Sequence, residues 1–127
     1  MENDITLVRL DPSCPAFDEV WEAFARYQCQ LGGDGLIGRR LFRLLKNAGF
    51  EQIELSFQPE VHWSGLPSFR PWVVNLIGNL DSGRQGLIAA GLCQPELIAR
   101  ACEELANLAE RSDGSATFCW NRARARR

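Results

Sequence analysis

Residues 33–38, Gly33-Asp34-Gly35-Leu36-Ile37-Gly38, match the G-x-G-x-x-G pattern of dinucleotide-binding loops. In such a loop, backbone N–H groups at the start of a helix converge on a pyrophosphate, which requires the loop to leave a buried parallel strand. Here the preceding residues, 15–31, carry apolar side chains at helical spacing. We therefore expect the glycines to end one helix and to connect it to the start of the next helix. A small nucleotide-binding enzyme is the alternative interpretation.

His62 is the single histidine and lies beside Trp63. A histidine can act as a general base because its ordinary pKa lies near neutrality. The sequence supplies no identifiable partner for it, so a structural or solvent-facing role is favoured. Trp63 is expected to border a cleft. The other three tryptophans fall on apolar stripes and are expected in the core: Trp21, Trp72 and Trp120.

The remaining reactive side chains form no recognisable centre. The cysteines form no CxxC pair and are expected to be reduced thiols, mostly in the core: Cys14, Cys29, Cys93, Cys102 and Cys119. With a single histidine and no CxxC pair, the sequence offers few ligands for a zinc site. The arginines at 122–127 are predicted to form a frayed, solvated tail. No Walker loop, nucleophile elbow or convincing catalytic pair occurs, so we predict no catalytic residue and no metal site.

Composition limits the class of protein. A chain of 127 residues with 46% hydrophobic residues can bury the core of one domain, and we expect a single domain over residues 1–127. The formal net charge of -2 gives no field that would favour nucleic acid, so no nucleic-acid partner is expected. The N-terminus is acidic, unlike a signal peptide, and no apolar run approaches the ~20 residues that span a bilayer. We expect a cytoplasmic protein without a membrane contact.

Apolar spacing predicts a helix-rich α+β domain. Helices are expected over residues 15–31, 34–48, 72–80 and 95–110, with a further short helix that begins near Ser82. Glu104 is placed on the polar face of the last helix.

Two segments alternate apolar and polar residues and are predicted strands: Gln52 to Phe57 and Ser115 to Trp120. Residues 5–10 are expected to form a third strand or an extended lead-in. We expect the first two strands to pair antiparallel and to share one buried face. That face would carry Ile53, Leu55, Phe57, Ala116, Phe118 and Trp120.

Residues 4–13, the helix from Pro15 and the run from Gly33 to Phe50 resemble class I S-adenosylmethionine-dependent methyltransferases of the ubiquinone/menaquinone-biosynthesis type. The most specific part is Ile37-Gly38-Arg39-Arg40-Leu41, followed by Leu44-Leu45 and Ala48-Gly49-Phe50. The resemblance implies that this run follows the fifth strand of a Rossmann-like sheet. Residues 52–57 would then be the sixth strand and residues 115–120 the seventh, antiparallel strand. Residues 64–112 would be a helical insertion over the substrate side.

The family builds its S-adenosylmethionine site from its first strand, a glycine-rich loop and an acidic residue that ends its second strand. All of these would precede Met1. The resemblance therefore implies the C-terminal part of a methyltransferase fold, with no cofactor and no methyl transfer on its own. S-adenosylmethionine would bind if an N-terminal half completed it. By position and residue type, four residues are candidates for the substrate side: Arg39, His62, Trp63 and Trp72.

Two hypotheses describe the whole chain. In the first it is the substrate-side portion of a methyltransferase-like protein, truncated or encoded as a split gene. In the second it is a free-standing, non-catalytic binding or oligomerisation domain derived from that fold. The helices and strand pair would expose apolar surface once separated from the rest of the sheet. We therefore expect a homodimer or a complementing N-terminal half as partner.

Overall fold

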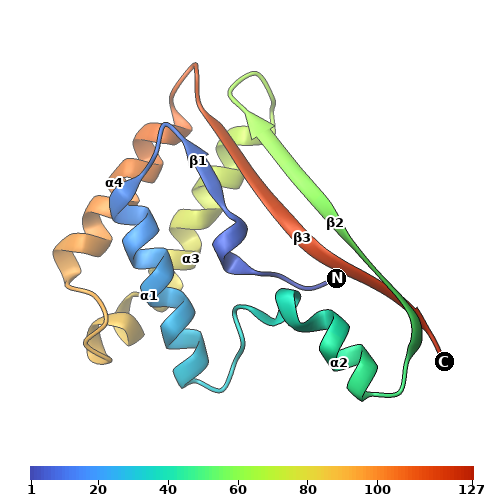
Figure 1. Cartoon of the computed structure of the whole chain (residues 1–127). Helices are drawn as coiled ribbons and strands as arrows, with labels where there is room; N and C mark the ends of the chain where they lie inside the picture. The colour runs from blue at the N-terminus through green and yellow to red at the C-terminus, as the bar shows by residue number, and fades with distance from the viewer.

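The chain forms a three-stranded antiparallel sheet with three long helices near one end and a short helix on the ribbon that extends from it (Figure 1). The computed structural model describes residues 1–127. Its helices are α1 (Pro15–Gln30), α2 (Leu41–Asn47), α3 (Phe69–Ala89) and α4 (Pro95–Ala109), and its strands are β1 (Arg9–Asp11), β2 (Glu51–Trp63) and β3 (Ser115–Arg126). The 3-10 turns η1 (Ile5–Leu7) and η2 (Ile37–Arg40) precede β1 and α2. This mixture of helices with an antiparallel sheet confirms the α+β prediction.

β3 is the central strand, in the order β1-β3-β2, and it is antiparallel to both neighbours. The predicted antiparallel pair is therefore confirmed, but both strands are longer than expected. Residues 58–63 lie opposite residues 115–120, and residues 54–57 lie opposite residues 121–124. The predicted frayed tail was wrong, because β3 continues to Arg126. Arg122 and Arg124 are held across from Ser56 and Glu54, and the Arg122 Nε–H donates to Ser56 Oγ at 3.0 Å.

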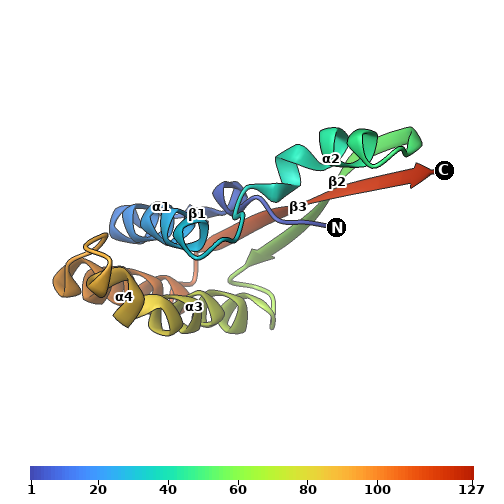
Figure 2. The same cartoon turned by 90° about the horizontal axis from the view of Figure 1, so that it is seen from below.

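This register decides which side chains share a face of the sheet. Residues directly opposite each other in an antiparallel pair point to the same side. Phe118 and Trp120 therefore share a face with Glu60 and Gln58, and the predicted common face with Leu55 and Phe57 was wrong. We call the face that carries Glu60 and Trp120 the inner face, because α1 and α3 pack on that side. The other is the outer face, on which α2 lies; Figure 2 shows α2 on the opposite side of the β2–β3 ribbon from α3 and α4.

The helices follow the predicted spacing with two differences. The expected helix over residues 34–48 is divided into η2 and α2, and none of the residues of α2 is fully buried. α3 is one continuous helix of 21 residues, so the separate helix at Ser82 was wrong. The Ser82 hydroxyl donates to the Asn79 carbonyl within the helix, at 2.7 Å, instead of capping a new one. None of the helices is both long enough and apolar enough to cross a membrane.

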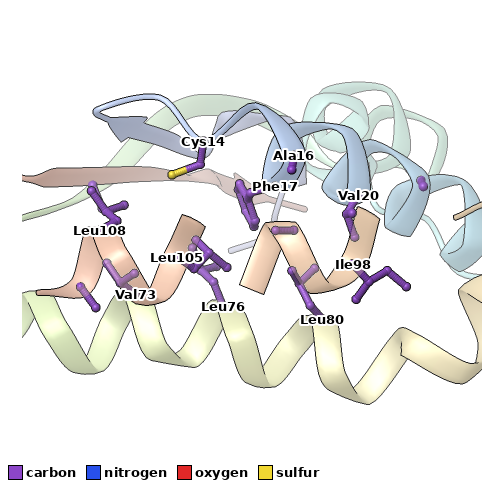
Figure 3. Close-up of a cluster of buried hydrophobic side chains, with 14 of the residues drawn as sticks. Cys14, Ala16, Phe17, Val20, Val73, Leu76, Leu80, Ile98, Leu105 and Leu108 are labelled. Atoms are coloured by element: carbon purple, nitrogen blue, oxygen red, sulfur yellow. The ribbon is translucent and has the colours of Figure 1, made fainter. Parts of the chain in front are cut away.

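The hydrophobic core lies where α1, α3 and α4 meet. Figure 3 shows Phe17 and Val20 of α1 facing the side chains of the other two helices. The largest fully buried side chains come from all three helices: Phe17, Val20, Val73, Leu80, Leu87, Ile98 and Leu105. Burying each such side chain contributes roughly 1.5–3 kcal/mol, so this helical layer is the main stabilising unit to which the sheet is attached.

Glu104 of α4 caps the N-terminus of α1. Its carboxylate oxygens accept the backbone N–H groups of Ala16, at 3.1 Å, and Phe17, at 3.0 Å. These groups have no partner within α1, and a negative charge is favourable at a helix N-terminus. Glu104 was predicted on the solvated face of α4, and instead it is half-buried against the start of α1. Beside it, burial together with the charges of Glu104 and Asp18 raises the pKa of the Cys14 thiol to about 11, so this thiol is protonated at neutral pH.

Candidate functional site

A pocket of about 530 Å³ lies between α1, α3 and the inner face of the sheet. Eight of its thirteen lining residues are hydrophobic: Ile5, Val8, Trp21, Phe24, Trp72, Leu76, Phe118 and Trp120. The five others are polar: Asn3, Gln28, Glu60, Asn75 and Asn79. Apolar walls with a few convergent polar groups are typical of small-molecule sites, and the volume lies within their usual range.

The aromatic walls of this pocket are fixed by hydrogen bonds. The indole N–H of Trp21 donates to the Ile5 carbonyl at 2.7 Å. The indoles of Trp72 and Trp120 both donate to the Glu60 carboxylate, at 3.0 Å to Oε2 and 2.8 Å to Oε1. Each tryptophan thus has its polar atom satisfied and its ring held in one orientation. A pocket with such walls is formed before a ligand arrives, which lowers the entropic cost of binding.

Glu60 connects the sheet to α3. It lies on β2 opposite Phe118, and its carboxylate bridges Trp120 of β3 and Trp72 of α3. The hydrogen bond from Trp120 lowers the pKa of Glu60, and the bond from Trp72 and the nearby His62 ring add to this against the opposing effect of burial. Glu60 is therefore ionised at neutral pH. Its side chain is still 38% exposed, so the carboxylate can be reached from the pocket.

His62 and Trp72, two of the predicted substrate-side candidates, lie together. Their rings stack with centroids 5.3 Å apart. The His62 Nδ1 is 2.8 Å from Ser68 Oγ, whereas Nε2 is buried without a hydrogen bond, 3.9 Å from Glu60 Oε2. Trp72 lines the pocket and His62 does not. His62 therefore supports the wall from behind instead of facing a ligand.

Arg39 and Trp63, the other two candidates, lie away from the pocket. Arg39 forms an ion pair with Asp4, at 2.7 Å, and its Nε–H donates to the same carboxylate at 2.8 Å. It acts on the pocket only indirectly, because Asp4 lies between two lining residues, Asn3 and Ile5. Trp63 is on the outer face of β2 and is 49% exposed. Of the three tryptophans expected in the core, Trp21 and Trp72 are partly buried and pack against it. Together with Trp120 they also line the pocket, whereas Trp63, which was expected to border a cleft, does not line it.

Sequence reasoning missed the polar residues of the pocket. The strand was predicted to end at Phe57, so Glu60 was not placed on a sheet face. Asn75 and Asn79 were overlooked, although they are four residues apart on the predicted helix and therefore lie on one side of it. A strand extended to Trp63 would have placed Glu60 and His62 on a common face.

The loop at Gly33–Gly38 does not have the surroundings of a dinucleotide or S-adenosylmethionine site. It follows α1, which ends at Gln30, and not a strand. Four of its backbone N–H groups are hydrogen-bonded within the fold: Gly33 donates to the Gln28 carbonyl, Leu36 to the Asp34 carboxylate, Ile37 to the Asp34 carbonyl and Gly38 to the Asn3 carbonyl. They do not converge on an anion. The structure therefore agrees with the interpretation of these glycines as a connection between helices.

Other candidate sites are weaker. A pocket of about 490 Å³ at the turn between α3 and α4 has three hydrophobic residues among eight and carries both Glu19 and Arg100. No group of three or more His, Cys, Asp and Glu side chains is arranged to hold a metal ion. Of the five thiols, Cys14 and Cys93 are buried, while Cys29 is exposed.

Comparison with known proteins adds no relative: no family model matches the chain, and no curated protein matches it.

Proposed function

We propose that this chain is the substrate-side, C-terminal portion of a class I methyltransferase-like protein. Its part in that protein is to hold the methyl acceptor in the pocket between α1, α3 and the sheet. The observation that carries the proposal is this pocket, with aromatic walls and a single carboxylate, on the side of the sheet covered by α3. The segment 64–112, which the resemblance places over the substrate side, contributes Trp72, Asn75, Leu76 and Asn79 to it.

The sheet also offers a place where a complementing half would attach. β1 pairs only with residues 115–117 of β3, and Glu2 exchanges two backbone hydrogen bonds with Asn121, at 2.8 and 2.9 Å. Beyond Asn121, residues 122–126 of β3 have β2 on one side and no strand on the other. A strand that continued the line of Glu2 would fill this edge and extend the sheet. Exposed strand edges of this kind readily accept another strand.

In this proposal the chain contributes acceptor binding, and a complementing N-terminal half would contribute the cofactor. Four of the six N–H groups of the glycine-rich loop at Gly33–Gly38 are hydrogen-bonded within the fold, which supports a role for the chain that does not include holding S-adenosylmethionine on its own.

The test begins with the DNA upstream of Met1 or in a neighbouring gene. It should encode an apolar strand followed by a Gly-x-Gly-x-Gly loop, with an acidic residue roughly 20 positions later. S-adenosylmethionine is then titrated calorimetrically into this chain alone and into the chain joined to that half. We expect binding only in the joined protein. Unrelated upstream sequence, or no binding by the joined protein, would contradict the methyltransferase assignment and favour the free-standing binding domain.

The pocket itself is tested separately on the chain alone. A neutral aromatic probe, benzyl alcohol, should shift the indole N–H resonances of Trp72 and Trp120 in NMR spectra. The resonance of Trp63, on the outer face, should not move and serves as the internal control. Equal shifts of all tryptophans, or none, would show that the pocket takes no such molecule.

A further inference from the structure

The pocket carries one formal charge. Of its thirteen lining residues, Glu60 alone is ionisable near neutral pH, and no lysine or arginine lines the walls. The two groups that hydrogen-bond to Glu60 within the pocket are indole N–H donors, which are neutral. They satisfy one lone pair on each oxygen and hold the carboxylate ionised, but they do not cancel its charge.

The surroundings of this charge are aromatic. Trp72 and Trp120 are joined through the carboxylate itself, and Phe118 meets Trp120 edge to face, with centroids 5.0 Å apart. On the α1 side, Trp21 and Phe24 stack at 5.5 Å. The faces of such rings attract cations, most strongly those of tryptophan. The carboxylate therefore favours positive charge on a ligand, and the apolar rings around it favour a ligand with an apolar body.

The same features disfavour the other classes of ligand. An anionic molecule would meet Glu60 without any basic side chain in the lining to offset the repulsion. A strongly hydrated inorganic cation would lose water to walls that are mostly apolar, at a cost that one carboxylate does not repay. An organic cation with an apolar body loses little hydration and fills the space between the rings.

We propose that the pocket selects an organic cation, an amine or quaternary ammonium carried on an aromatic or aliphatic body, with Glu60 as the counter-ion. The inference rests on the proposed function, because it names the class of molecule that the same pocket takes. Asn75 and Asn79, on one side of α3, lie within the lining as further polar contacts.

Three probes of similar size test this on the whole chain by calorimetric titration at low salt: benzyltrimethylammonium, benzyl alcohol and benzoate. We expect the cation to bind about tenfold more tightly than the alcohol, and benzoate more weakly than both. Glu60→Gln should reduce the preference for the cation to about twofold or less and leave the affinity for benzyl alcohol almost unchanged. The matched control is Glu54→Gln, on the same strand and outside the pocket lining, which should keep the preference.

A measurement on the unmodified chain tests the same inference without relying on the folding of the variant. Raising the salt to about 0.5 M NaCl should weaken benzyltrimethylammonium severalfold and leave benzyl alcohol unaffected, because only the charged probe is screened. Equal affinities for cation and alcohol, or a preference that survives Glu60→Gln in a folded variant, would overturn the inference about charge but not the assignment of the pocket as a binding site. If none of the probes binds, the proposal that the pocket is a small-molecule site is contradicted as well. Failure to find a cofactor-binding half would remove the methyltransferase assignment alone.

Discussion

At the scale of single residues, the pocket depends on side chains that lie outside it. Asp4 is 4% exposed, and its carboxylate accepts hydrogen bonds from Arg39 and from the backbone and hydroxyl of Thr6. Burial by itself raises the pKa of Asp4, but these bonds outweigh it and lower the pKa below its ordinary value. The charged form of Asp4 thus holds the N-terminal segment against η2, and with it the lining residues Asn3 and Ile5.

Asp4→Asn should lower the free energy of unfolding at pH 7 by about 1 kcal/mol, because the charge-assisted bonds are replaced by weaker neutral ones. A carboxyl with a lowered folded-state pKa stabilises the protein above its unfolded pKa, near 3.9, and this contribution disappears as the pH falls through the folded pKa. The wild-type protein and the variant should therefore differ most above the unfolded pKa of Asp4 and converge as the pH falls below its lowered folded pKa. Urea unfolding at several pH values measures this.

The control for this variant is Asp81→Asn, which removes an exposed i,i+3 pair with Arg84 on α3 and should change stability little. A constant difference between Asp4→Asn and wild type across the whole pH range would contradict the role given to the Asp4 charge.

At the scale of elements, the contact between α1 and α3 depends on a missing side chain. A Cβ built on Gly83 would lie 2.5 Å from Phe24 Cε2, far inside contact distance. Phe24 also lines the pocket. Glycine is unfavourable in a helix interior by up to about 1 kcal/mol, so its presence in the middle of α3 is explained by this close approach of the two helices.

Gly83→Ala should therefore destabilise the protein by about 1–3 kcal/mol, although alanine is the better helix former, because Phe24 must move within a packed layer. Gly78→Ala is the matched control on the same helix. A Cβ at Gly78 meets nothing within 4 Å, so this substitution should stabilise by up to about 1 kcal/mol. Thermal and urea unfolding of both variants measure the difference, and stabilisation by both would show that the helices do not approach this closely.

At the scale of the whole molecule, the β2–β3 ribbon extends away from the helical layer, as Figure 2 shows, and leaves apolar side chains uncovered. The outer stripe consists of four outer-face residues of β2, each about half exposed or more: Leu55, Phe57, Val61 and Trp63. The free edge of β2 is a poor site for sheet extension. Ser64 donates its backbone N–H to the Gly114 carbonyl, and in an antiparallel pair every second residue of a strand bonds to the same neighbour. By this alternation the backbone nitrogen of Pro59 points away from β3, toward the free edge, where proline has no hydrogen to donate to another strand. A second copy is therefore expected to cover the stripe face to face.

Light scattering should show a mass that rises with concentration from 14.3 kDa toward twice that value. Phe57→Lys, in the middle of the outer stripe, should hold the chain as a monomer, because burying the stripe would then bury a charge. Ile88→Lys, at an isolated exposed apolar position on α3, is the control and should leave association unchanged. A monomer at all concentrations would contradict this prediction.

The sequence by itself determined the elements whose signals are local. The 3.6-residue period defined α1 and α4, the period of two marked β2 and β3, and the glycines after α1 were correctly understood as a connection. Among the site candidates, His62 and Trp72 proved to be neighbours, because their segments adjoin along the chain.

Only the tertiary structure decided which local signals meet. The register of β2 on β3 joins residues about sixty positions apart, and it places Glu60 beside Trp120 and exposes Phe57. Glu104 caps a helix 88 residues away in sequence, and Arg122 to Arg126 become a strand because β2 is long enough to pair with them. A periodic pattern in the sequence indicates which side of a helix or strand is apolar, but it does not indicate which other element packs against that side. The pocket is lined by residues from α1, α3 and the sheet, so the position of Glu60 among the aromatic side chains is determined only when these elements pack together.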